Sequence, residues 1–281
     1  MSLLTGALRP RRALSATGLA AALLLPVAAT AGAPLHGPPA PREDGERDVP
    51  SRDGRRTLLR LPHNLARNAV GLVLPDNLVP LLGGAAVTAA SFALDDDVRD
   101  YFQEEERLGS LHSFGDKLGD AEVVVPLAAG LFLVGRLAEN QRFRDMTYDF
   151  AQTQIAAGLI GGGLKTLVGR ERPNGSNDRS FPSGHSYSWF AAARVVDHHY
   201  GTLAALPAYG LWALAAASRL DNDTHYFSDA VAGAALGFLV ARVAVRRNRE
   251  PLPGQVPAPR LSVAPWTPAG EGLGVRVHLE F

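Results

Sequence analysis

The sequence of 281 residues contains no cysteine. A chain without thiols forms no disulfide, has no cysteine nucleophile and offers no cysteine for lipid attachment. It also lacks an excess of either charge, because 28 Lys and Arg balance 28 Asp and Glu. A neutral chain gives no reason to expect a nucleic-acid partner. Any active site in this chain must therefore draw its nucleophile and its charge from locally clustered residues other than cysteine.

The N-terminus has the pattern of an export signal. Three arginines precede an apolar stretch, and a site with small residues, suited to cleavage, follows it: Arg9, Arg11, Arg12, then 18–27, then 29–31. We therefore predict a signal peptide over residues 1–31 and an exported protein that is periplasmic or membrane-associated. An uncleaved membrane anchor is the alternative, and the paired arginines raise a twin-arginine route that the following residues match poorly. Residues 32–62, rich in proline and charge, predict a disordered linker.

Residues 63–250 predict a helical domain. Fourteen of the twenty prolines lie outside this segment. Six apolar stretches lie within it: 77–94, 123–135, 151–164, 187–196, 203–217 and 230–245. Residues 95–97, all Asp, begin a polar helix that reaches residue 106. Acids in the first turn of a helix interact favourably with its dipole, so we prefer this interpretation of 95–97 to a cation site.

The apolar stretches are short for a membrane protein. A spanning helix needs about 20 mostly apolar residues, and only 77–94 and the stretch before Ser218 approach that length, while Arg242 interrupts the last one. The sequence therefore favours an exported bundle that does not cross the membrane. Small residues in the helices, typical of packing between membrane helices, keep the spanning alternative and contact with a membrane surface open.

Two further patterns concern the C-terminal tail and residues 197–199. Residues 251–281 predict a tail with a β-hairpin, because 260–266 and 272–281 flank a turn rich in Pro and Gly, and the second alternates between apolar and polar residues. Asp197, His198 and His199 resemble metal ligands, but adjacent residues point in different directions on a helix, so we interpret them as a helix terminus.

Three clusters of polar residues stand at the edges of apolar stretches, where a helix would meet a loop: 165–173, 180–185 and 218–229. Ser183 and Gly184 precede a predicted helix, whose free N–H groups would bind an anion. Lys165, Arg172 and Arg219 could surround the remaining oxygens of that anion, the arginines as bidentate forks. This inventory predicts a phosphate site.

Two histidines and a carboxylate complete the inventory. His225 and Asp229 are four residues apart, so on a helix they share one face. The carboxylate can fix the tautomer of His225 and leave its other nitrogen free to attack. His185 would protonate the leaving oxygen and then activate water. Such a pair of histidines allows covalent catalysis without a cofactor or a metal, so we predict neither.

These residues resemble the three-part signature of the type 2 phosphatidic acid phosphatase superfamily, which includes bacterial acid phosphatases, lipid phosphate phosphatases and vanadium haloperoxidases. The matching patterns are Lys165-x6-Arg172-Pro173, Pro182-Ser183-Gly184-His185 and Ser218-Arg219-x5-His225-x3-Asp229. No residue of the signature is missing. The short segment 174–181 between the first two patterns departs from the family by leaving little room for a loop that selects substrate.

The resemblance implies an all-α fold with a six-helix core bundle of the acid phosphatase/haloperoxidase type. It implies that His225 forms a phosphohistidine, that Asp229 orients it and that His185 is the general acid and base. The residues that hold the phosphate would be Lys165, Arg172, Ser183, Gly184 and Arg219.

The expected activity is metal-independent hydrolysis of phosphomonoesters or pyrophosphates, on lipids or small organic molecules, with the active site outside the cytoplasm. One alternative is a vanadium haloperoxidase, in which His225 would bind the vanadium. Another is a noncatalytic membrane protein that binds lipid headgroups. The substrate and the oligomeric state stay open at this point.

Overall fold

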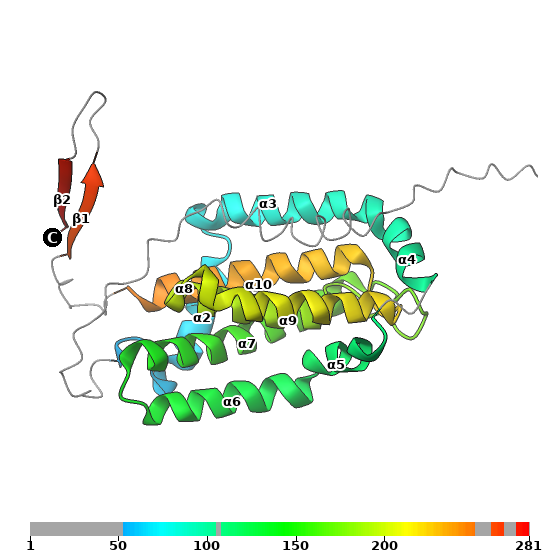
Figure 1. The fold of residues 1–281 in the computed structure, drawn as a ribbon, viewed down its shortest axis with the longest axis horizontal. Coiled ribbons are helices and arrows are strands. Elements are labelled where there is room, and N and C mark those ends of the chain that lie inside the picture. Colours follow the sequence, from blue (N-terminus) through cyan, green and yellow to red (C-terminus); the bar gives the residue numbers. More distant parts are fainter. Residues whose placement is uncertain (1–52, 105–107, 251–259, 267–273, 281) are drawn as a thin grey trace, which may run out of the picture.

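The computed structural model describes residues 53–104 and 108–250, together with the backbone of residues 260–266 and 274–280 (Figure 1). The predicted signal peptide and linker residues 32–52 lie outside the described residues. Within residues 53–104 and 108–250 the secondary structure is entirely helical, as the sequence predicts.

The helical elements follow in chain order as η2 (Leu58–Arg60), α2 (Leu61–Gly71), α3 (Pro75–Ser91), η3 (Phe92–Leu94), α4 (Asp95–Gln103), α5 (Ser110–Leu118), α6 (Ala121–Leu137), α7 (Gln141–Val168), α8 (Gly184–Tyr200), α9 (Thr202–Asp221) and α10 (Phe227–Asn248). All six apolar stretches are helical, and the polar stretch after residue 94 is α4. Helices α2 and α5 were not predicted.

Helices α8 and α10 form the centre of the bundle. Helix α10 packs against α8, α3 and α7, and most of its residues are buried. A Cβ added at Gly233 would lie 2.5 Å from the carbonyl oxygen of Ser183, and one added at Gly237 would lie 2.5 Å from that of Tyr187. Only glycine therefore lets the two main chains touch, as in the Gly-x-x-x-Gly contacts of membrane helices. This contact fixes the first turns of α8 and α10 relative to each other.

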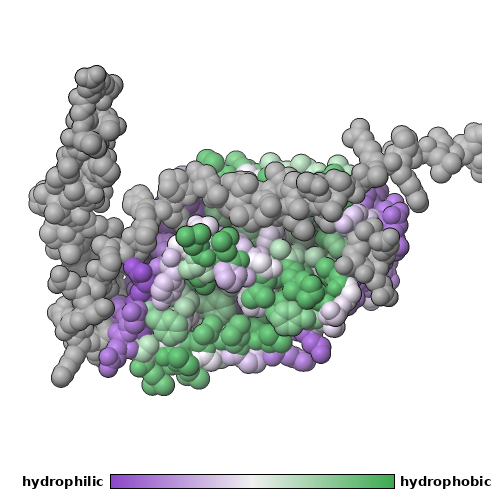
Figure 2. All heavy atoms as spheres, in the orientation of Figure 1, coloured by the Kyte–Doolittle hydropathy of each residue, from purple (hydrophilic) through white to green (hydrophobic). Residues whose placement is uncertain are grey.

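Three helical segments are long and apolar enough to cross a membrane: Pro75–Gln103, Thr202–Asp221 and Phe227–Asn248. Helices α5 and α6, bent by 58° at their junction, make a fourth if they count as one span. The visible face of the bundle is largely apolar between more polar ends (Figure 2), and exposed apolar side chains include Val79 of α3 and Leu133 of α6. The body is therefore that of an integral membrane protein with three or four candidate spans.

This result corrects the prediction of a bundle that does not cross the membrane. The apolar stretches underestimate some of the helices, since α6 extends over Ala121–Leu137 and α10 over Phe227–Asn248. Arg242 does not interrupt α10, because its Nε contacts Oδ1 of Asn77 on α3 at 3.3 Å. A polar side chain on a neighbouring helix thus accepts a hydrogen bond from the arginine that seemed to break the span.

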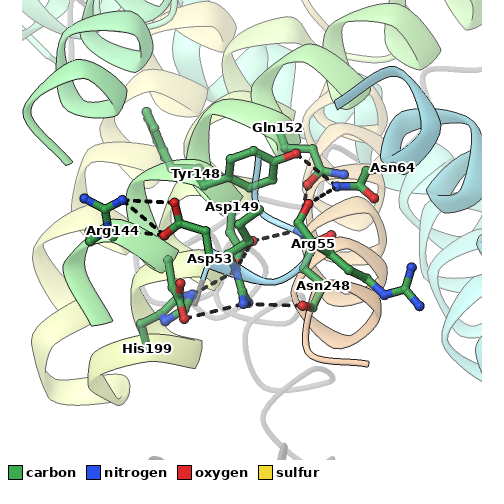
Figure 3. A network of polar contacts seen from close by, with 12 residues as sticks. Asp53, Arg55, Asn64, Arg144, Tyr148, Asp149, Gln152, His199 and Asn248 are labelled. Carbon is green, nitrogen blue, oxygen red and sulfur yellow. Dashed lines mark hydrogen bonds and ion pairs between the residues drawn. The ribbon is translucent and has the colours of Figure 1, made fainter. Parts of the chain in front are cut away.

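A buried polar network fastens the start of the described chain to the bundle (Figure 3). The guanidinium of Arg56 donates to both carboxylate oxygens of Asp149 on α7, each at 2.9 Å. His199 of α8 and Asn248 of α10 contact the same carboxylate at 2.9 and 2.7 Å. Asp53 bonds Arg144 at 2.9 Å. Residues 53–60, predicted as the end of a disordered linker, are thus packed against three helices.

The cluster at 197–199 is a helix terminus, as predicted. Asp197 accepts a hydrogen bond from Thr202 at 2.9 Å and one from Tyr209 at 3.2 Å, whereas His199 turns to Asp149. Among residues 53–104 and 108–250, no three His, Asp or Glu side chains gather in a group that could hold a metal ion.

In the tail, β1 (Arg260–Trp266) pairs antiparallel with β2 (Gly274–Glu280), and Arg260 lies opposite Glu280. The alternation after residue 272 predicted the second strand. The residues between the two strands lie outside the described part of the chain.

Candidate active site

The three polar clusters meet at one end of the bundle, where α4 and α5 also lie (Figure 1). Helix α7 ends at Val168, and the C-cap residue Gly169, with a φ of 58°, turns the chain into the segment that leads to α8. Two main-chain bonds join the clusters: the N–H of Ser183 donates to the carbonyl oxygen of Asp229 at 2.9 Å, and that of Ser180 donates to the carbonyl oxygen of Arg170 at 2.9 Å. The fold therefore brings together segments that are far apart in the sequence.

His225 and Asp229 face each other as their spacing predicts. His225 Nδ1 lies 3.6 Å from Asp229 Oδ2, and the hydroxyl of Ser180 donates to the same oxygen and lies 3.4 Å from Nδ1. Burial lowers the pKa of His225 to about 4, although the hydrogen bond with Asp229 acts in the opposite direction. The imidazole is therefore neutral at pH 7. With Nδ1 turned to a carboxylate, its lone pair belongs on Nε2.

Lys165 and Arg172 lie close enough to each other to repel. Lys165 Nζ donates to the carbonyl oxygen of Arg179 at 2.8 Å, and Arg172 Nε donates to Asn177 Oδ1 at 3.0 Å. Burial and then the charge of Arg172 lower the pKa of Lys165 to about 8. Burial and then Arg219 lower the pKa of Arg172. An anion bound between these cations would offset their repulsion and raise the pKa values of both Lys165 and Arg172.

The start of α8 matches the predicted anion site in part. Ser183 is the N-cap residue, but its side chain makes no capping bond. Its Oγ is buried and has no hydrogen-bond partner among the described residues. Gly184 is the first residue of the helix, so the N–H groups of this first turn have no partner within it.

His185 and Arg219 are turned toward α5. His185 Nε2 contacts the carbonyl oxygen of Asp116 at 2.7 Å and lies 3.6 Å from Asp120 Oδ1. Arg219 forms an ion pair with the carboxylate of Asp116. Burial, followed by the charge of Arg219, lowers the pKa of His185. No contact joins the two site histidines among the described residues, although the same end of the bundle carries both.

A family described as the PAP2 superfamily matches residues 149–251, which contain all eight predicted site residues. This segment of the chain is therefore similar to the PAP2 superfamily over residues 149–251.

The chain is also similar to two individual proteins. A lipid A 1-phosphatase from Porphyromonas gingivalis is 30% identical over 171 residues, which are 59% of this chain and 36% of that protein. The chain thus spans about a third of the length of this curated relative. A crystal structure of a transmembrane PAP2 type phosphatidylglycerolphosphate phosphatase from Bacillus subtilis has 19% identity and a TM-score of 0.44, covering 66% of this chain and 92% of that chain.

Arg170 also belongs to the site, although the sequence patterns did not single it out. Its guanidinium donates to Asp229 Oδ1 at 2.8 Å and to Ser228 Oγ at 2.7 Å. The guanidinium carbon lies 3.9 Å from the centre of the Tyr226 ring, and the N–H of Tyr226 donates to Asp229 Oδ2 at 2.9 Å. The carboxylate that faces His225 is thereby held in one orientation. Arg170 stands in the first polar cluster, which was the available signal.

Asp95 supports the same arrangement from α4. It accepts hydrogen bonds from the N–H of Ser228 and from its hydroxyl, both at 2.7 Å, and from Arg170 Nη2 at 2.8 Å. Asp95 lies in the first turn of α4, as the prediction of acids at the start of that helix requires, and its carboxylate also caps α10. Its neighbour Asp96 is exposed. No local signal distinguishes the three, because the partners of Asp95 lie 75 and 133 residues away.

Proposed function

We propose that this chain is a phosphatase that hydrolyses a phosphomonoester or pyrophosphate of a membrane lipid through a phosphohistidine. The observation that carries this proposal is the state of His225, which is buried, neutral and turned by Asp229 so that one nitrogen keeps its lone pair. Two cations, Lys165 and Arg172, lie within electrostatic reach and form no ion pair among the described residues. A neutral nucleophile next to uncompensated positive charge suits attack on an anionic phosphoryl group.

The proposed reaction has two steps. Nε2 of His225 attacks phosphorus, the bond to the leaving oxygen breaks, and His185 gives that oxygen a proton. Water then attacks the phosphohistidine while His185 accepts a proton, and the phosphorus–nitrogen bond breaks to release phosphate. Asp229 stabilises the charge on His225 at each stage, and the first turn of α8 with Arg219 would hold the phosphoryl oxygens.

Lipid substrates suit the architecture better than soluble esters. The site lies at one end of a bundle whose outer helices expose apolar side chains along their length, so an acyl chain in the bilayer can remain there while its phosphate enters. The similar protein from Porphyromonas gingivalis is a lipid A 1-phosphatase, which supports the same choice. The N-terminal export pattern supports a site on the outer side of the membrane.

Phosphate release by the full-length protein in detergent micelles tests the proposal. The substrates are an aryl phosphate, phosphatidic acid, lipid A and a polyprenyl pyrophosphate, each at matched concentration. We expect turnover of at least one lipid phosphate and a preference for it over the aryl phosphate. His225→Ala should abolish turnover, whereas His63→Ala, at an exposed histidine of α2, should not change it.

Two results would contradict the proposal. Turnover retained by His225→Ala would remove the assigned nucleophile. Preference for the aryl phosphate would replace the lipid with a soluble ester. A radiolabelled enzyme intermediate, stable in alkali and labile in acid, would separate a phosphohistidine from direct attack by water.

A further inference from the structure

One residue of α5 binds two of the groups that the proposed reaction needs. The carboxylate of Asp116 forms an ion pair with Arg219, and its Oδ1 also accepts a hydrogen bond from Asn222 Nδ2 at 2.8 Å. The carbonyl oxygen of the same residue is 2.7 Å from His185 Nε2. While α5 keeps this position, Asp116 therefore occupies Nη1 of Arg219 and Nε2 of His185, and a substrate cannot use either atom.

We propose that Asp116 is an internal ligand that takes the place of a substrate phosphate oxygen, and that substrate binding displaces α5. This inference rests on the proposed phosphatase function. A guanidinium recognises carboxylate and phosphate oxygens with the same geometry, so one anion can exchange for the other at Arg219. Release of the Asp116 carbonyl frees His185 in the same movement.

Unused hydrogen-bond groups near Asp116 support its exchange for a larger anion. Arg219 uses Nη1 for Asp116, while its buried Nε has no partner among the described residues. The buried Oγ of Ser183, two residues before His185, is also without one. A phosphate offers more acceptor oxygens than a carboxylate and could engage both groups. Buried groups without partners weaken the closed state relative to the substrate complex.

The ends of α5 allow such a movement. Glycines flank the helix on both sides, Gly109 with a φ of 47° and Gly119 before the bend of 58° that leads into α6. A Cβ added at Gly119 would lie 2.2 Å from the His185 ring, and one added at Gly115 would lie 2.9 Å from Ser218. Because neither glycine carries a side chain, α5 can lie this close to His185 and Ser218. No side chain at these two positions would obstruct the movement of α5 away from the site.

A second contact holds α5 in place away from the phosphate groups. His112 Nδ1 lies 2.6 Å from Asp221 Oδ2 at the end of α9. Loss of this contact should shift α5 toward the displaced position without altering Arg219 or His185. The apparent affinity for an anion rises in proportion to the fraction of molecules in which the site is open.

The experiment compares the full-length protein with Asp116→Asn, His112→Ala and Glu122→Gln. Asparagine keeps the shape of Asp116 and removes its charge. Glu122, exposed in the first turn of α6, is the matched control, because none of the ion pairs within residues 108–250 joins it to the site. Two quantities are measured in detergent: the Kd of inorganic phosphate by calorimetry, and kcat and KM with the best lipid substrate.

We expect Asp116→Asn to bind inorganic phosphate about tenfold more tightly, which corresponds to about 1.4 kcal/mol, and to lower KM without lowering kcat. His112→Ala should tighten phosphate binding by a smaller factor, and Glu122→Gln should leave it unchanged. Equal or weaker phosphate binding by Asp116→Asn would overturn the proposal. A lower kcat with unchanged phosphate affinity would also overturn it, because Asp116 would then position His185 instead.

The binding measurement keeps the two proposals apart. If the wild-type protein binds phosphate but hydrolyses no ester, the proposed function fails while the competition between Asp116 and phosphate is still tested by the Kd values. If hydrolysis is observed and the Kd values of the variants do not change, the proposed function stands and the internal ligand does not.

Discussion

Replacement of Asp95 by asparagine should lower both stability and turnover, although Asp95 touches none of the eight predicted site residues. The carboxylate holds Arg170 and caps α10 at Ser228. In the Asp95→Asn variant, the amide oxygen can still accept from the N–H of Ser228, but its NH₂ group would face the guanidinium, so two donors meet. The loss of one charge-assisted hydrogen bond costs about 1.5–3 kcal/mol, and breaking a buried ion pair costs about 3–5 kcal/mol. We expect a loss of about 3 kcal/mol.

That loss corresponds to a fall in Tm of about 6–12 °C for a domain of this size. Turnover should fall because Arg170 also holds the carboxylate that faces His225, and a displacement of about 1 Å in a catalytic group can cost about 100-fold in rate. We expect a decrease in kcat of at least about tenfold.

The assay measures Tm by tryptophan fluorescence in detergent and kcat at a temperature where both proteins are folded. The matched control is Asp96→Asn, which removes the same charge from the exposed neighbour and should change neither quantity. If Asp95→Asn and Asp96→Asn behave alike, the reasoning that joins α4 to the site through Arg170 is wrong. A lower Tm with unchanged kcat would show that Asp95 supports the fold but does not position Asp229.

Further predictions concern the cations and the centre of the bundle. The pKa of Lys165 is about 8, so its charge is lost as pH rises through that value, and KM should increase above it. In the Lys165→Arg variant the side chain stays charged. A pH profile of KM should therefore show the increase at higher pH in this variant. Arg56→Met leaves the buried carboxylate of Asp149 without its cation and should cost about 3–5 kcal/mol, lowering Tm while kcat of the folded protein is unchanged. Gly233→Ala drives a Cβ into the carbonyl oxygen at the start of α8 and should lower both Tm and kcat, whereas Gly210→Ala, which faces open space, should alter neither.

The local part of the site follows from the sequence. The spacing of His225 and Asp229 places them face to face, because four residues make about one helical turn, and the structure has this arrangement. Each polar cluster also lies at a helix end, since the apolar stretches beside it mark where the helices run.

Contacts between distant segments could not be predicted in the same way. The bond from Arg170 to Asp95 spans 75 residues, and that from Arg219 to Asp116 spans 103. Nothing near either acid in the sequence marks it as a partner, because the choice depends on which helix end the fold brings close. The apolar stretches also gave too short a length for α6 and α10, since the ends of these helices carry polar or charged residues that have partners or exposure in the bundle.

The contact between α8 and α10 has a consequence for how such a site responds to its surroundings. No side chain separates the two helices at Gly233 and Gly237, so the distance between their first turns is set by main-chain atoms in van der Waals contact. Changes in bilayer thickness or lateral pressure act first on the outer helices, whose apolar side chains can shift or repack. The spacing of the groups carried by α8 and α10 should then be similar in membranes of different composition. Substitutions on the outer helices could change which lipid is admitted while leaving that spacing intact.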